Sequence, residues 1–246
     1  MRYKLTIAYD GTAYCGWQVQ LSGRSIQEFI QKALSTILRT PTALTGAGRT
    51  DSGVHARGQT AHFDVNQPID PARLRLSLNA LLPPDIRILQ VDETPEPFHA
   101  RYSAKSKIYH YHLHLSSVID PFVRLYRHHV HGMCDLKRMA AAAVEFLGTH
   151  DFLSFANEPN KGSSSRGSIR TLYRLDLIEQ KGGVRLEFEG NGFLYKMVRN
   201  ITGALIDVGA GKLDPQDVRK IFAAKDRKRS SAAAPAQGLF LMEVRY

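Results

Sequence analysis

The chain has 246 residues, enough for one large hydrophobic core or two small ones. Its 33 lysines and arginines against 23 acidic residues give a formal charge of +10, which favours a polyanionic partner such as a nucleic acid, although a ribosome-bound or generally basic protein would have the same charge. No apolar run is long enough to span a membrane, no signal peptide is visible, and two isolated cysteines argue against a disulfide framework or a thiolate metal site. We therefore expect a cytoplasmic protein.

The first hundred residues alternate between strand and helix patterns. Arg2 to Tyr9 has apolar side chains at every second position, which is typical of a half-buried strand. Ser25-Ile-Gln-Glu28 has the composition of a capping box and precedes apolar residues at helical spacing. A strand over Gln59 to Val65, a helix over Pro71 to Leu82 and a strand over Asp85 to Val91 follow. This order predicts an α+β fold.

The stretch from Gly46 to Phe63 is a predicted loop that concentrates the candidate chemistry. Its glycines, with threonine, aspartate and serine among them, favour turns. Asp51 stands between Arg49 on one side and His55 and Arg57 on the other, and a carboxylate near cations stays ionised, available as a nucleophile or base. The stretch lacks the Lys-Ser/Thr pair of a phosphate loop and the following helix of a dinucleotide fingerprint. Taken alone, it fits an Asx turn with solvated arginines equally well.

The second half opens with a predicted strand over Lys105 to Leu115, which can link two sheets. Three histidines, His110, His112 and His114, share one face of this strand and are potential metal ligands. No carboxylate or cysteine stands at ligand spacing beside them, and surface histidines on a basic strand are the commoner case. We therefore expect no metal site.

The remaining elements continue the mixed pattern. Asp135 is the predicted cap of a helix that ends at Gly148. Residues 157–168 form a polar loop that either closes over RNA or is a plain surface excursion. Further predicted elements are a hairpin of Thr171 to Glu179 with Val184 to Glu189, a helix over Phe193 to Val208, a helix starting at Asp214-Pro215 and a last strand over Leu239 to Tyr246.

Residues 48–56, Gly-Arg-Thr-Asp-Ser-Gly-Val-His-Ala, resemble the signature of the tRNA pseudouridine synthase A family, which isomerises uridines in the anticodon arm of tRNA. Other segments resemble the same family in the same order and cover nearly the whole chain. They are residues 8–12, 16–18, 79–87, 98–101, 109–111, 150–152 with 154–155, 192–200 and 238–239.

The resemblance implies an α+β fold of two similar subdomains, residues 1–104 with the catalytic loop and residues 105–246. Their antiparallel sheets are expected to join into one larger sheet, with a cleft between the subdomains. It also implies a homodimer in which one tRNA touches both subunits, and an isomerase acting on uridines 38, 39 and 40 of the anticodon stem-loop. Because this isomerisation neither oxidises nor hydrolyses anything overall, we expect no cofactor.

By the same resemblance, Asp51 is the catalytic aspartate. It attacks C1′ or the uracil ring as a nucleophile, or removes a proton from the ribose, and the sequence leaves all three routes open. Tyr109 matches the active-site tyrosine, with its ring stacked on the uracil and its hydroxyl assisting proton transfer at C5. Without the resemblance, Tyr109 would be a buried tyrosine of a sheet.

Three arginines and a histidine complete the implied site. Arg199 matches the arginine that pairs with the catalytic carboxylate, although an ordinary surface arginine would look the same. Arg49 is expected to fill the space left by a uridine that has flipped out of its stack. His55 and Arg57 either contact phosphate or support the loop. The rival interpretations are a non-catalytic RNA-binding module and a hydrolase that uses Asp51.

Overall fold

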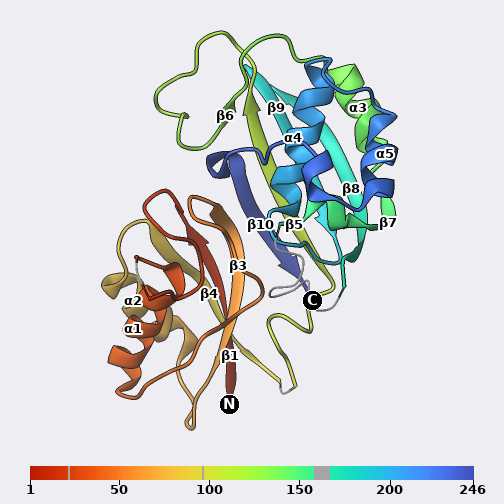
Figure 1. The fold of residues 1–246 in the computed structure, drawn as a ribbon. Coiled ribbons are helices and arrows are strands. Elements are labelled where there is room, and N and C mark those ends of the chain that lie inside the picture. The colour runs from red at the N-terminus through yellow and green to blue at the C-terminus, as the bar shows by residue number, and fades with distance from the viewer. Residues whose placement is uncertain (22, 96, 158–166) are drawn as a thin grey trace. The chain divides into compact units, whose positions relative to one another are not determined.

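The computed structural model describes residues 1–21, 23–95, 97–157 and 167–246. Within these residues the chain forms five α-helices and ten strands, which confirms the predicted α+β class (Figure 1). The chain divides into two compact units, one of residues 1–105 with 240–246 and one of residues 106–239. The last strand therefore belongs with the first unit. Most of the polar loop predicted over 157–168 lies outside the described residues.

The first unit is a sheet with helices along one face. Its strands lie in the order β4-β1-β3-β10, with β1 antiparallel to β3 and β4, and with β10 parallel to β3. Every second side chain of β1, from Tyr3 to Tyr9, is buried, as the alternation predicted. Helices α1 and α2 lie side by side along the sheet (Figure 1). The elements are β1 (Arg2–Tyr9), α1 (Ile26–Leu38), β2 (Thr45–Gly46), β3 (His55–Asp64), α2 (Pro71–Leu81), β4 (Ile86–Thr94) and β10 (Leu239–Arg245).

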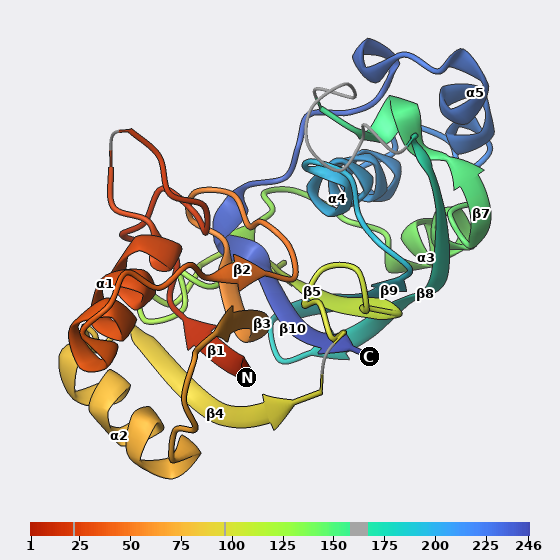
Figure 2. The same cartoon turned by 90° about the horizontal axis from the view of Figure 1, so that it is seen from below.

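The second unit contains a sheet in the order β5-β9-β8-β7, in which each strand is antiparallel to its neighbours. The short strand β6 pairs with β5 in parallel. Helices α3 and α4 lie over one face of it (Figure 2). No helix in the described parts of either unit combines the length and apolar character needed to cross a bilayer. The elements are β5 (Ser106–His114), β6 (His128–His129), α3 (Leu136–Val144), β7 (Gly148–Asp151), β8 (Ile169–Gln180), β9 (Gly183–Gly190), α4 (Met197–Gly209) and α5 (Asp217–Ala224).

Helix capping agrees with the sequence at one helix and not at another. The Asp135 side chain accepts hydrogen bonds from two backbone N–H groups of α3, so the predicted cap is confirmed. Helix α3 ends at Val144, before the predicted end, because the next three N–H groups bond to carbonyls three residues back. The capping box of α1 is wrong: Ser25 makes no side-chain cap, and Glu28 instead pairs with Lys32 at 2.6 Å.

Two helices of the second unit begin later than predicted. Helix α4 starts at Met197 rather than Phe193, because Lys196 has a φ of 59°, a left-handed conformation that a helix does not accommodate. Helix α5 starts at Asp217 rather than at Asp214, because the Asp217 N–H bonds to the Asp214 carbonyl three residues back in a tighter turn.

The first unit should lose stability in mild acid through His62 on β3. This side chain is 5% exposed, and its Nδ1 accepts a hydrogen bond from the Ala100 N–H at 3.1 Å. Burial, with the charge of Arg2, lowers the pKa of His62 to about 4. His62 of the unfolded chain therefore binds a proton more readily than His62 of the folded chain. The stabilisation that the neutral, buried His62 provides is fully present above about pH 6.5 and is lost between pH 6.5 and about 4. We expect the free energy of unfolding to fall by roughly 1 to 2 kcal/mol over this range.

Urea unfolding from pH 7 to pH 4.5 tests this expectation against His62→Asn. Asparagine offers an acceptor oxygen close to the position of Nδ1 but does not titrate. The variant should lose less stability than the wild type over that range. Parallel pH curves for the two proteins would show that His62 does not carry the effect.

Candidate active site

Asp51 lies in the connection between β2 and β3, which we call the Asp51 loop and define as residues 47–54. The predicted strand over Gln59 to Val65 is confirmed, but it starts earlier than expected: β3 begins at His55, so the loop does not extend beyond residue 54, and β3 pairs with β1 on one side and β10 on the other. This pairing satisfies the backbone despite the glycine content. Gly58 serves close packing rather than a turn, because a Cβ there would lie 2.3 Å from a carbonyl oxygen of β10.

The segment after β1, residues 10–17, packs directly against the Asp51 loop. A Cβ at Gly11 would lie 2.0 Å from the carbonyl oxygen of Val54, and a Cβ at Gly16 would lie 2.4 Å from that of Thr50. Gly16 also has a φ of 99°, which residues with a Cβ rarely adopt. Both glycines are therefore required by the close approach of this segment to the Asp51 loop.

The charged side chains around Asp51 differ in exposure. Asp51 is half-buried, whereas Arg49 and Arg57 are exposed. Across the described residues, neither arginine makes a side-chain hydrogen bond or ion pair with the protein. Exposed guanidinium groups without protein partners can bind phosphates or fill the space left by a displaced base.

His55 is a buried residue at the start of β3, directly after the Asp51 loop. It is 1% exposed, and its ring stacks on Phe240 with 4.6 Å between the ring centres. The Gly11 N–H donates to His55 Nδ1 at 3.1 Å, and an Asp10 carboxylate oxygen lies 3.1 Å from the same nitrogen. Burial of this kind favours the supporting role for His55, whereas the exposure of Arg57 suits a phosphate contact.

Tyr109 and Arg199 lie in the second unit. Tyr109, on β5, is 7% exposed, and its ring stands edge-on to Phe193 with 5.0 Å between centres. Arg199 lies in the first turn of α4, where its Nε donates to the Ala234 carbonyl at 2.7 Å while the Ala234 N–H donates to the Arg199 carbonyl at 2.9 Å. This two-way contact directs the guanidinium group. Because Asp51 belongs to the first unit, its pairing with Arg199 stays a prediction.

The histidines near β5 and β6 engage carbonyl oxygens. His114 Nε2 lies 2.8 Å from the Val118 carbonyl, and His129 Nε2 lies 2.9 Å from that of Ser116. Burial lowers the pKa of His112 to about 4, so this ring is neutral at pH 7. In the part of the chain that the structure describes, no three histidine, cysteine or acidic side chains are grouped as a metal site would require.

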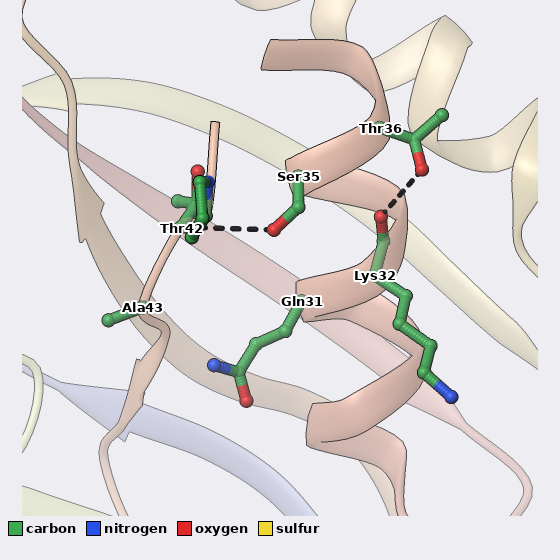
Figure 3. Close-up of a pocket in the computed structure, with 7 residues that line it drawn as sticks. Gln31, Lys32, Ser35, Thr36, Thr42 and Ala43 are labelled. Atoms are coloured by element: carbon green, nitrogen blue, oxygen red, sulfur yellow. Dashed lines mark hydrogen bonds between the residues drawn. The ribbon is translucent and has the colours of Figure 1, made fainter. Parts of the chain in front are cut away.

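A pocket of the first unit lies between α1 and residues 41–43, which precede β2 in the chain (Figure 3). Two hydrogen bonds cross or border it, from the Thr42 N–H to Ser35 Oγ and from the Thr36 hydroxyl to the Lys32 carbonyl. None of the predicted site residues lines it. The lining residues are Gln31, Lys32, Ser35, Thr36, Pro41, Thr42 and Ala43.

Comparison with known proteins identifies the family. The family model described as tRNA pseudouridine synthase matches residues 5–103 and 142–246. The tRNA pseudouridine synthase A 1 of Protochlamydia amoebophila is 55% identical over 245 residues, 99% of this chain and 96% of the relative. The tRNA pseudouridine synthase A of Chlamydia muridarum is 49% identical over 98% of this chain and 91% of the relative, and that of Bacillus subtilis is 41% identical over 100% and 99%.

These matches define the protein as an enzyme of the isomerase class. The chain belongs to the tRNA pseudouridine synthase family.

Proposed function

We propose that the chain converts uridine to pseudouridine at positions 38, 39 and 40 of the anticodon stem-loop of tRNA, with Asp51 as the catalytic carboxylate. The C1′–N1 bond breaks, the base turns, a C1′–C5 bond forms, C5 loses its proton and N1 gains one. Each of the three routes for the carboxylate requires it ionised and fixed in place. The observation that carries the proposal is the half-buried Asp51 on a tightly packed loop between two exposed arginines.

The other roles follow from what each side chain offers. Arg199, directed by the Ala234 carbonyl, forms a bidentate pair with Asp51 and orients it. The Tyr109 ring stacks on the uracil, and its hydroxyl assists proton transfer at C5. In the proposed functional division, residues 1–104 form the subdomain that carries Asp51. Residues 105–246 form the subdomain that carries Tyr109 and Arg199.

Tritium release tests the function directly. The purified protein is incubated with a tRNA transcript that carries C5-tritiated uridine, without added cofactor. Because bond formation at C5 expels the label, release in stoichiometry with the target uridines is the expected result. Bound tRNA without release would support an RNA-binding module instead, and free uracil or a cut strand would indicate a hydrolase.

Arg49→Ala should discriminate between stacked and unstacked substrates. A stacked uridine costs a few kcal/mol to flip out, and the role proposed for the exposed Arg49 side chain is to fill the vacated space. We expect a loss on the order of tenfold or more in kcat/KM on an anticodon stem-loop, and a much smaller loss on an unstructured oligonucleotide.

Arg57→Ala is the matched control, since it removes the other exposed guanidinium group near Asp51. A phosphate contact at Arg57 serves both substrates, so its loss should reduce both rates in similar proportion. The flipping role of Arg49 fails if Arg49→Ala also reduces both rates equally.

The enzyme is further proposed to act in the cytoplasm as a homodimer, with one tRNA touching both subunits. The formal charge of +10 supports a tRNA-binding surface larger than the site itself. Light scattering with and without tRNA gives the masses of the protein and the complex. A monomer that binds one tRNA would contradict the dimer.

A further inference from the structure

The side chain of Thr50, the residue before Asp51, is hydrogen-bonded to a buried tyrosine of the sheet. Tyr9, the last residue of β1, is 4% exposed, and its hydroxyl oxygen lies 2.8 Å from Thr50 Oγ1. Thr50 is itself buried and immediately precedes Asp51. The two residues are 41 positions apart in the chain, so the contact joins the end of a strand to the Asp51 loop.

The backbone on both sides of Asp51 is already held by other hydrogen bonds. The Trp17 N–H donates to the Thr50 carbonyl at 3.1 Å, and the Gly53 N–H donates to the Tyr14 carbonyl at 3.3 Å. These bonds limit where the loop lies. The Thr50 side chain between these two bonds is held separately, by the Tyr9 hydroxyl.

Tyr9 is well suited to hold that side chain because it is rigid. Its ring packs against Trp17, with 6.1 Å between ring centres, and the indole of Trp17 fills the space where a Cβ at Gly46 would lie, 2.6 Å from Nε1. Burial raises the pKa of the Tyr9 hydroxyl, so the hydroxyl stays protonated and can donate. A group locked on a strand positions a loop more accurately than a group on another loop.

We propose that Tyr9 is a positioning residue for the reaction, whose hydroxyl fixes Thr50 and thereby the direction of the Asp51 carboxylate. The inference rests on the role proposed above for Asp51. Tyr9 touches no substrate in this account. Its contribution is to keep the carboxylate in its reactive orientation before tRNA binds. A displacement of a reacting group by about 1 Å can cost up to about a hundredfold in rate.

Tyr9→Phe removes the hydroxyl and keeps the ring. We expect the single-turnover rate at saturating enzyme to fall about tenfold, with the Kd for tRNA changed less than about twofold. Tyr3→Phe is the matched control. Tyr3 lies on the same strand and the same buried face, and its hydroxyl bonds to the Ile69 carbonyl at 3.2 Å, remote from the loop. It should show a comparable loss of thermal stability with an unchanged rate.

Variants at Thr50 make the same test from the other side of the bond. Thr50→Ser keeps the hydroxyl and should retain the wild-type rate, whereas Thr50→Val should slow the reaction as Tyr9→Phe does. The double variant Tyr9→Phe/Thr50→Val should be no slower than the slower single variant, because both remove one interaction.

A wild-type rate for Tyr9→Phe, or equal slowing by Tyr9→Phe and Tyr3→Phe, would overturn the inference while the tritium release of the wild type upheld the proposed function. An inactive wild type would overturn both.

Discussion

Asp51→Asn will abolish pseudouridine formation while leaving tRNA binding largely intact. Asparagine has nearly the same shape, but it carries no charge and is neither a nucleophile nor a base at neutral pH. The backbone of the loop keeps its bonds, including that from the Val54 N–H to the residue 51 carbonyl at 3.2 Å. We expect the single-turnover rate to fall on the order of 10³-fold or more, with the Kd for tRNA within a few-fold of the wild type.

Asp64→Asn is the control for loss of a carboxylate elsewhere in the same unit. Asp64 ends β3 and accepts two hydrogen bonds from Arg2, at 2.7 and 2.8 Å, which lower the pKa of this carboxyl. Its loss should cost a little stability and no activity. Full turnover by Asp51→Asn would refute the catalytic assignment, and equal losses in the two variants would assign the effect to net charge.

The fold was predictable where one physical rule governs a segment. Alternation along β1 predicted its buried side chains because one face of the sheet packs on helices. Helix starts were less predictable, because they depend on the backbone conformation of single residues. Helix α4 begins after Lys196, whose backbone is left-handed, and a lysine side chain gives no indication of this conformation. The capping box at Ser25 failed because the side chain is buried without a partner among the described residues.

The sequence pointed to the candidate residues of the site, but not to the contacts that hold them in the folded chain. The signature stretch indicated Asp51, Arg49 and Arg57; Asp51 is half-buried, and the exposure of the two arginines suits their proposed roles. His55 looked like another cation near the carboxylate, but tertiary packing makes it a buried ring. Tyr9 looked like the last apolar residue of a strand. No local pattern relates a strand end to a loop 41 residues later; only the folded chain shows that contact.

Tyr109→Phe should separate proton transfer from binding. Phenylalanine keeps the ring that packs edge-on to Phe193 and stacks on the base in the proposed site, so the Kd for tRNA should change less than about threefold. Loss of the hydroxyl removes the assistance at C5 and should slow the reaction roughly a hundredfold. Because proton removal then limits the rate, a substrate deuterated at C5 should show a larger isotope effect with this variant than with the wild type.

Tyr246→Phe is the control for a lost tyrosine hydroxyl, since Tyr246 donates to the Ala100 carbonyl at 2.8 Å in the first unit. It should keep both the wild-type rate and the wild-type isotope effect. If Tyr109→Phe instead weakened binding with an unchanged rate at saturation, the hydroxyl would contact tRNA in the ground state, since an interaction lost equally from ground and transition state changes affinity alone. An unchanged isotope effect in a slow variant would place the hydroxyl at a step before C5 loses its proton.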